Sequence, residues 1–153
     1  MKITELMGID FIVPALSSKK KKGVLKEMVD CIARKEPDID EKELLRVLLE
    51  REELGSTGIG DGIAIPHGKV KKIKGLIVAF GRSLPGIDFQ SMDGNLTHIV
   101  FLLIAPENSA GVHLKALARI SRLLKDSGFR KNLMEANSSQ EIYDIIAQED
   151  EKY

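Results

Sequence analysis

The sequence lacks tryptophan, has a single cysteine among its 153 residues, and carries no net charge. One cysteine, Cys31, can form neither a disulfide framework nor a cysteine-based metal site, and its lone presence favours a reducing compartment. The 23 Lys and Arg residues balance the 23 Asp and Glu residues. No electrostatic argument therefore favours nucleic acid or an anionic membrane as a partner.

Long hydrophobic runs are also missing. The longest apolar stretch, "IVFLLIA" at 99–105, has seven residues, far fewer than the roughly 20 that a membrane-spanning helix needs. The N-terminal "MKITELMGID" has no apolar core of the kind found in signal peptides. We therefore predict a cytoplasmic protein with no segment inserted in a membrane.

The order of hydrophobic patterns predicts a small α/β protein. Residues 10–16 indicate an edge strand, because Pro14 has no N–H to donate to a neighbouring strand. Two amphipathic helices are expected next, over 18–35 and between a capping Asp40 and a terminating Gly55. Further strands are expected at 63–65, 76–80 and 97–105, a short extended piece at 87–89 after a turn at 85–86, and helices at 112–125, 128–136 and 138–148. This order favours helices that cover a mixed sheet, without internal repeats or linkers.

The most unusual stretch is "GIGDGIAIPHGK" at 58–69, which holds four glycines, a proline and a histidine. It matches neither common nucleotide-binding pattern. A P-loop has the pattern G-x-x-x-x-G-K-[ST], whereas five residues separate Gly62 from Gly68 and Val70 follows the lysine. The dinucleotide fingerprint G-x-G-x-x-G also fails, because the first three glycines are evenly spaced. Nucleotide binding is therefore not predicted.

His67 is the chemically notable residue of this segment. Pro66 restricts the backbone before it, and Gly68 lets the chain turn away after it. This context would present His67 just after the end of a strand. A lone histidine in a glycine-rich turn is, however, more often an incidental surface residue than a functional one.

Two other residues could join His67. His113 falls in the first turn of the helix expected at 112–125, where free backbone N–H groups favour anions. Arg51 lies near the end of the helix that leads into the glycine-rich segment, and its guanidinium could bind a phosphoryl group. Spacing alone does not show that the three converge.

The remaining candidates are weaker. His98 lies inside an expected apolar strand, and we interpret it as structural. A metal site is not favoured, because His67 and His113 are 46 residues apart and match no metal-binding spacing. Asp61 could be a third ligand, although a turn or orienting role is simpler. The lysine run at 19–22 is interpreted as a solvated turn.

The segment "REELGSTGIGDGIAIPHGKV" at 51–70 resembles the active-site signature of phosphotransferase-system (PTS) EIIA domains of the fructose, mannitol and nitrogen-regulatory type. Three later segments resemble the same family in the same order, namely "IDFQSMDG" at 87–94, "HIVFLLIAPE" at 98–107 and "HLKALARISRLL" at 113–124. The resemblance extends over nearly the whole chain. It implies a single domain at 1–153 with a three-layer sandwich fold, in which helices cover both faces of a mixed sheet of about four to five strands.

The resemblance also implies a histidine phosphocarrier. The family's phosphorylated histidine falls on His67, its second active-site histidine on His113, and its active-site arginine on Arg51. Asp61 matches a position that is acidic or an amide in the family, and we predict Asp61 and Thr57 as supporting residues. Neither a cofactor nor a metal is implied.

Neutral imidazole is a competent nucleophile near pH 7. The family implies that His67 takes a phosphoryl group from HPr or its nitrogen-branch relative and passes it to a IIB domain or a regulatory target. We predict a stand-alone nitrogen-regulatory type. The alternatives are the IIA subunit of a fructose or mannitol transporter, and a binding module controlled by the phosphorylation state of His67. A non-catalytic relative, such as the cytoplasmic domain of an anion exchanger, would not need both histidines.

Overall fold

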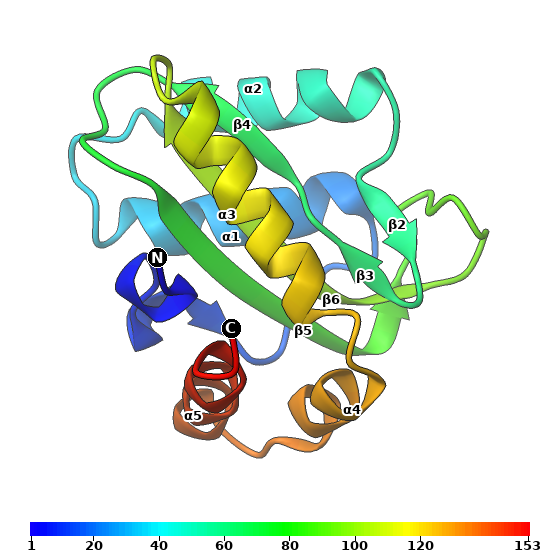
Figure 1. Ribbon diagram of the computed structural model, residues 1–153. Helices are drawn as coiled ribbons and strands as arrows, with labels where there is room; N and C mark the ends of the chain where they lie inside the picture. Colours follow the sequence, from blue (N-terminus) through cyan, green and yellow to red (C-terminus); the bar gives the residue numbers. More distant parts are fainter.

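The computed structural model describes residues 1–153 and arranges them around a six-stranded mixed sheet (Figure 1). The strands are β1 (Ile12–Val13), β2 (Gly58–Gly60), β3 (Ile63–Ala64), β4 (His67–Val70), β5 (Ile77–Ile87) and β6 (Thr97–Pro106). The helices are α1 (Lys21–Ala33), α2 (Glu41–Glu53), α3 (Ala110–Leu123), α4 (Ser127–Glu135) and α5 (Ser139–Asp150), with short 3-10 turns η1 (Ile3–Glu5) and η2 (Ile9–Phe11).

Strand β6 lies at the centre of the sheet. It pairs antiparallel with β5 on one side, and on the other side it pairs parallel with β3 and then with β4. β1 is the outer strand next to β5, and β2 is the outer strand next to β3. The register places His67 opposite Leu103, so the start of β4 lies beside the middle of β6.

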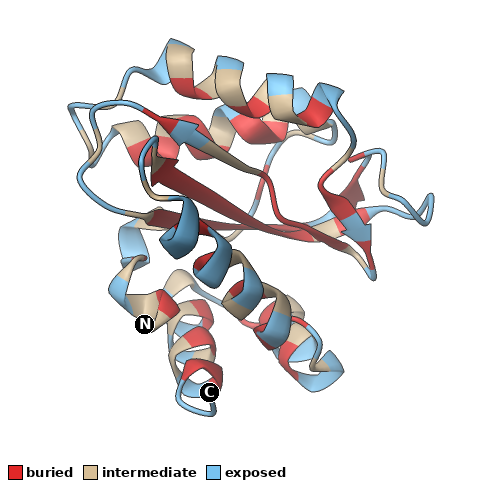
Figure 2. Cartoon of the chain, turned by 45° about the horizontal axis from the view of Figure 1, so that its top comes forward, coloured by how far each residue is buried: buried red, intermediate tan, exposed pale blue.

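Side chains of β6 alternate between two hydrophobic cores, as the period of two along a strand requires. Ile99, Phe101 and Leu103 join the core under α3, α4, α5 and η1. The intervening Val100 and Leu102 join the core under α1 and α2. Figure 2 shows the buried strands between helices whose inner faces are also buried. A strand buried on both faces is continuously apolar rather than alternating, which explains its hydrophobic run.

The expected α/β class, mixed sheet and helices on both faces are confirmed, but the sheet has six strands rather than four to five. β1 is an edge strand, and the Asp40 side chain caps α2 by accepting from the N–H groups of Lys42 and Glu43, both as expected. β2 and β4 were not predicted. They are short, glycine-containing segments without alternation, and they are extended because they pair with neighbouring strands.

The turn expected at 85–86 was wrong. The chain there stays in β5, which runs from the piece expected at 76–80 to the first residue of the piece expected at 87–89. The β5–β6 register shifts between Arg82 and Ile87, and such an irregularity tolerates proline because a ladder hydrogen bond is already missing. Gly86 adopts φ +100°, a conformation that favours glycine.

Arg82 is a buried cation in β5 that has backbone partners in place of a carboxylate. Its Nε donates to the Pro14 carbonyl at 2.9 Å, and its Nη1 donates to the carbonyls of Leu133 at 2.9 Å and Ala136 at 2.6 Å. Burial lowers the pKa of the guanidinium below its ordinary value, although an arginine remains charged. The side chain therefore ties the sheet to the segment after β1 and to the end of α4.

We expect Arg82→Met to lower the free energy of unfolding by at least about 2 kcal/mol, because buried carbonyl oxygens would lose their donors. Urea unfolding followed by circular dichroism measures this change. Arg46→Met is the matched control, since Arg46 lies on the exposed face of α2 and pairs there with Glu43 and Glu50. Equal losses in the two variants would contradict the role assigned to Arg82.

Candidate active site

Helix α2 packs closely against β4 at Gly68. A Cβ atom at this position would lie 2.7 Å from Cγ1 of Val47, closer than side chains approach one another. Glycine is therefore required for this contact. Because side chains alternate along a strand, Gly68 faces α2 and the adjacent His67 points to the opposite face, which α3 covers. His67 follows the end of β3 by three residues, as expected, but it is also the first residue of β4, which was not predicted.

The His67 ring is oriented by the backbone two residues earlier. Its Nδ1 lies 2.8 Å from the carbonyl oxygen of Ile65. A carbonyl oxygen can only accept a hydrogen bond, so Nδ1 must carry the proton. In the neutral ring, Nε2 therefore holds an unshared electron pair, and this geometry makes Nε2 the nucleophilic atom.

His113 is brought beside His67. The two ring centroids are 5.5 Å apart, with an angle of 69° between the ring planes. His113 belongs to the first turn of α3 and is only 6% exposed. Burial, followed by the charges of His67 and Lys69, lowers the pKa of His113 below its ordinary value. His113 is therefore neutral at pH 7, and its Nδ1 is buried without a hydrogen-bond partner.

Arg51 lies in the last turn of α2, one turn beyond the Val47 that contacts Gly68. Its Nη1 donates to the carbonyl oxygen of Gly55 at 2.9 Å, so the side chain turns toward the segment after α2. No hydrogen bond joins Arg51 to either histidine in this structure. Thr57 is buried nearby and is bound by the side chain of Glu52.

Asp61 lies apart from the two histidines. It occupies the tip of the β2–β3 hairpin with φ +56°, and its N–H donates to Oδ2 of Asp93 at 3.2 Å. Pairing to β6 places Ile63 opposite Ile99 but His67 opposite Leu103, so the tip is more than about 13 Å from His67 along the sheet. A supporting role for Asp61 stays a prediction.

His98 shares a shallow hollow with Asp61 and Arg130. Its Nδ1 bonds to the carbonyl oxygen of Ser83 at 2.9 Å, so His98 ties β6 to β5. This contact agrees with the structural interpretation of His98. The structure contains no cluster of three or more His, Cys, Asp and Glu residues that could hold a metal ion. None of its helices has both the length and the apolar character that crossing a bilayer requires.

Three residues near the site were missed by sequence reasoning. Lys69 follows His67 by two residues in β4 and therefore points to the same face. The positive charge of Lys69 helps to lower the pKa of His113. Glu52 and Lys21 form an ion pair of 3.0 Å with little exposure. The lysine run was interpreted as a solvated turn, whereas Lys21 is the first residue of α1. Only the strand assignment of residue 67 could have suggested Lys69.

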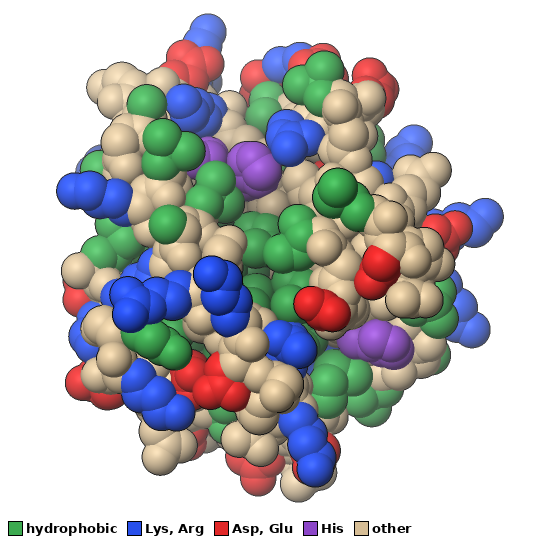
Figure 3. Space-filling model, turned by 45° about the vertical axis from the view of Figure 1, so that its right-hand side comes forward, with side chains coloured by type: hydrophobic (Ala, Val, Ile, Leu, Met, Phe, Trp, Pro, Cys, Tyr) green, Lys and Arg blue, Asp and Glu red, His purple; other side chains and the backbone are tan.

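Apolar side chains are exposed around the histidines. Leu54 follows α2, and Val112 and Leu114 flank His113 in α3; their exposed fractions are 85%, 46% and 65%. Figure 3 shows histidine side chains on the upper part of this face, with basic side chains nearby, above a hollow floored by hydrophobic side chains. An exposed apolar rim of this kind is suited to contact with another protein.

The chain belongs to a family of phosphotransfer proteins. The sequence model of the family described as "Phosphoenolpyruvate-dependent sugar phosphotransferase system, EIIA 2" matches residues 5–149. This match covers nearly all of the chain and includes both histidines and Arg51. The resemblance noted in the sequence is thereby confirmed.

Two kinds of name occur among its curated relatives. A "Nitrogen regulatory protein" of Bradyrhizobium diazoefficiens is 44% identical over 147 residues, which cover 96% of this chain and 95% of that protein. The "PTS system fructose-specific EIIABC component" of Bacillus subtilis is 43% identical over 150 residues, which cover 98% of this chain but only 24% of that longer protein. The identity to this chain is thus nearly the same for the nitrogen regulatory relative and for the fructose-specific relative.

Solved structures agree on the fold. The crystal structure of "Nitrogen Regulatory Protein IIA-Ntr" from Neisseria meningitidis matches with a TM-score of 0.87 and 32% identity, over 94% of this chain and 98% of that one. A complex of enzyme IIAMTL and phosphorylated enzyme IIBMTL from Escherichia coli matches with a TM-score of 0.78 and 21% identity, over 94% of this chain and 99% of that chain. The second likeness shows the fold alone.

The pKa of His113 should make stability depend on pH. In the unfolded chain this histidine has its ordinary pKa of about 6.5, whereas its pKa in the fold is lower. As the pH falls below about 6.5, the unfolded chain binds the proton first, and the fold loses stability. We expect the stability lost between pH 7.5 and pH 5.5 to be smaller in His113→Gln than in the native protein. Urea unfolding measures the stability at each pH, and an NMR titration that placed the pKa of His113 at 6.5 or above would refute the expectation.

The close contact between α2 and β4 can be tested by a double-mutant cycle. Gly68→Ala should lower the free energy of unfolding by about 1–3 kcal/mol, because the added methyl overlaps Val47. Val47→Ala alone should be destabilising through lost packing. The double variant should be more stable than the sum of the two losses predicts, because the smaller side chain makes room for the new methyl. Additive losses would show that the two positions do not share this space.

Proposed function

We propose that the chain is a histidine phosphocarrier of the phosphoenolpyruvate-dependent phosphotransferase system. His67 accepts a phosphoryl group from HPr or its nitrogen-branch relative, and passes it to a IIB domain or uses it for regulation. The observation that carries the proposal is the hydrogen bond from Nδ1 of His67 to Ile65, which leaves Nε2 as the nucleophile beside a neutral His113. The whole chain, residues 1–153, acts as one cytoplasmic domain in this proposal.

The transfer is a displacement at phosphorus. The electron pair on Nε2 of His67 forms a new phosphorus–nitrogen bond while the corresponding bond to the donor imidazole breaks, and that electron pair returns to the donor nitrogen. His67 keeps its proton on Nδ1, where the Ile65 carbonyl stabilises the charge that develops on the ring. No nucleotide or metal ion takes part in this step.

His113, Arg51 and Lys69 are the groups available to stabilise the phosphoryl oxygens. Nδ1 of His113 is buried without a partner in the unphosphorylated protein, and a protonated Nδ1 would find its acceptor in a phosphoryl oxygen. Lys69 contributes a positive charge on the same face. Arg51 would have to release Gly55, or use its other donors, to reach the phosphoryl group.

The regulatory type is favoured over the transporter subunit by one comparison. The structure of Nitrogen Regulatory Protein IIA-Ntr matches this fold with a TM-score of 0.87, against 0.78 for the IIA mannitol complex. In sequence, the nitrogen regulatory and fructose-specific relatives are nearly equal, at 44% and 43% identity. The transporter subunit therefore remains the second candidate. A sugar permease gene beside this gene would favour transport, and a gene for an alternative sigma factor would favour regulation.

Phosphoryl transfer can be tested directly. The protein is mixed with phosphoenolpyruvate, Enzyme I and HPr, or with their nitrogen-branch relatives, and intact mass spectrometry detects an acid-labile phosphoryl group. We expect one group on the native protein, none on His67→Ala, and slowed labelling of His113→Ala. His98→Ala is the matched control and should label like the native protein, because His98 serves β5–β6 packing. Absence of labelling with both donor sets would refute the phosphocarrier and favour a binding module.

A further inference from the structure

A buried ion pair lies behind the candidate site and takes no part in the chemistry described so far. The carboxylate of Glu52, in the last turn of α2, is 3.0 Å from Nζ of Lys21, the first residue of α1. The two side chains are only 4% and 13% exposed. The Lys21 ammonium also lies 5.1 Å from the centre of the Phe89 ring. Removing two charges from water is costly, so this pair needs further hydrogen bonds to persist.

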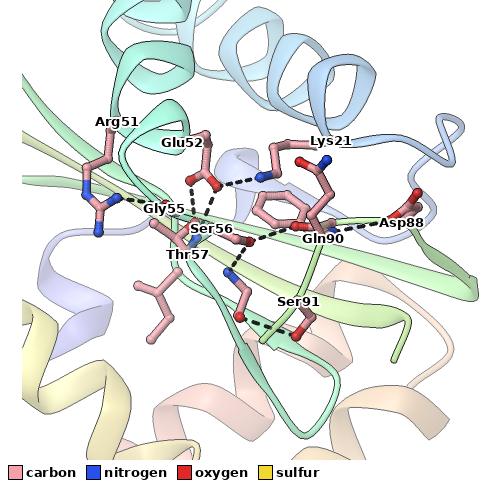
Figure 4. A network of polar contacts seen from close by, with 12 residues as sticks. Lys21, Arg51, Glu52, Gly55, Ser56, Thr57, Asp88, Gln90 and Ser91 are labelled. Carbon is pink, nitrogen blue, oxygen red and sulfur yellow. Dashed lines mark hydrogen bonds and ion pairs between the residues drawn. The ribbon is translucent and has the colours of Figure 1, made fainter. Parts of the chain in front are cut away.

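Thr57 supplies those hydrogen bonds. Its N–H donates to Oε1 of Glu52 at 3.0 Å, and its hydroxyl donates to Oε2 in a short hydrogen bond. Figure 4 shows the carboxylate between Lys21 on one side and Thr57 on the other. One carboxylate therefore connects the start of α1, the end of α2 and the segment that leads into β2.

Two hydrogen bonds connect Thr57 to the nucleophile. The carbonyl oxygen of Thr57 accepts from the N–H of Ile65 at 3.1 Å. The carbonyl oxygen of the same Ile65 accepts from Nδ1 of His67 at 2.8 Å. The Glu52 carboxylate thus holds Thr57, Thr57 holds Ile65, and Ile65 sets the proton position and orientation of the imidazole. A change at Glu52 would reach His67 through Thr57 and the backbone of Ile65.

The same segment also carries the partner of the candidate arginine. Arg51 precedes Glu52 in α2, and its Nη1 donates to the carbonyl oxygen of Gly55. Gly55 lies between Glu52 and Thr57, the two residues that the carboxylate links. Displacement of this segment would therefore change the place of the Arg51 guanidinium together with that of the His67 ring.

We propose that Glu52, balanced in charge by Lys21, is a positioning residue for phosphoryl transfer. It holds residues 54–57 so that His67 keeps its proton on Nδ1 and presents Nε2, while Arg51 stays directed to the edge of the site. The role depends on the phosphocarrier function proposed above, because positioning has no kinetic consequence without transfer. Its effect on the imidazole itself does not depend on that function.

The expected kinetic result is a loss in rate without a comparable loss in donor binding. Glu52→Ala should slow phosphoryl transfer about 10- to 100-fold, the range produced by a small misplacement of reacting groups. KM for phospho-HPr should change much less, because the buried carboxylate cannot touch the donor. Glu53→Ala is the matched control, an exposed glutamate at the adjacent position of the same helix. It should transfer phosphate at the native rate.

A second measurement reports on the ring and needs no phosphoryl donor. The ¹⁵N chemical shifts of the His67 ring distinguish a proton on Nδ1 from one on Nε2. The native protein and Glu53→Ala should show the Nδ1–H form, whereas Glu52→Ala should show a mixture of both. If no donor labels the native protein but these shifts differ as expected, the phosphocarrier function fails while the positioning by Glu52 stands.

Thr57→Val decides the outcome if Glu52→Ala does not fold. It removes the hydroxyl donor to the carboxylate but keeps the shape and the backbone N–H. Slowed transfer and a mixed His67 ring signal in the folded Thr57→Val protein would support the proposal. The double variant Lys21→Met/Glu52→Gln removes both charges and keeps an acceptor for Thr57, so it should recover part of the rate lost in Glu52→Ala. A native rate and native ring shifts in a folded Glu52→Ala or Thr57→Val protein would overturn the proposal that Glu52 positions His67.

Discussion

The pairing of β6 with its neighbours is the constraint on which the rest of the structure depends. Both rows of its side chains are buried, so this strand determines where the helices on each face can pack. It also brings the two histidines together. β4 lies beside β6 with His67 opposite Leu103, and the chain that leaves β6 enters α3, which carries His113. Residues distant in sequence therefore meet because each is attached to the same strand.

Most buried polar side chains in this fold have hydrogen-bond or ion-pair partners, but one atom without a partner belongs to His113, which lies beside His67. Glu52 is paired with Lys21, and Arg82 donates to backbone carbonyls. Nδ1 of His113 has no partner, and only two other buried side-chain polar atoms share this condition, namely Oγ1 of Thr97 and Oε2 of Glu149. Such an atom costs about 1–3 kcal/mol of stability. The candidate site therefore contains a buried nitrogen that lacks a hydrogen bond, and an anion beside His67 would supply an acceptor if that nitrogen carries the proton.

The sequence predicted the long helices and strands, and singled out His67 and His113, better than it predicted the tertiary contacts that position these residues. The helix expected at 112–125 is α3, displaced by two residues, because an amphipathic repeat is a local signal. β4 has no such signal, since "HGKV" becomes a strand only by pairing with β6. The proton position on His67, the Gly55 contact of Arg51 and the burial of Lys21 all depend on tertiary contacts. A local sequence pattern cannot predict such contacts, because each of them depends on how the folded segments pack together.

The two ends of the chain lie close together (Figure 1). Nζ of Lys2 donates to the backbone carbonyl of Asp150 at 2.9 Å, and the N–H of Thr4 donates to the Asp150 side chain at 3.1 Å. Adjacent termini let a domain be inserted into a longer polypeptide, or appended to one, without rerouting its own backbone. A related sequence of this length makes up a quarter of the fructose-specific relative.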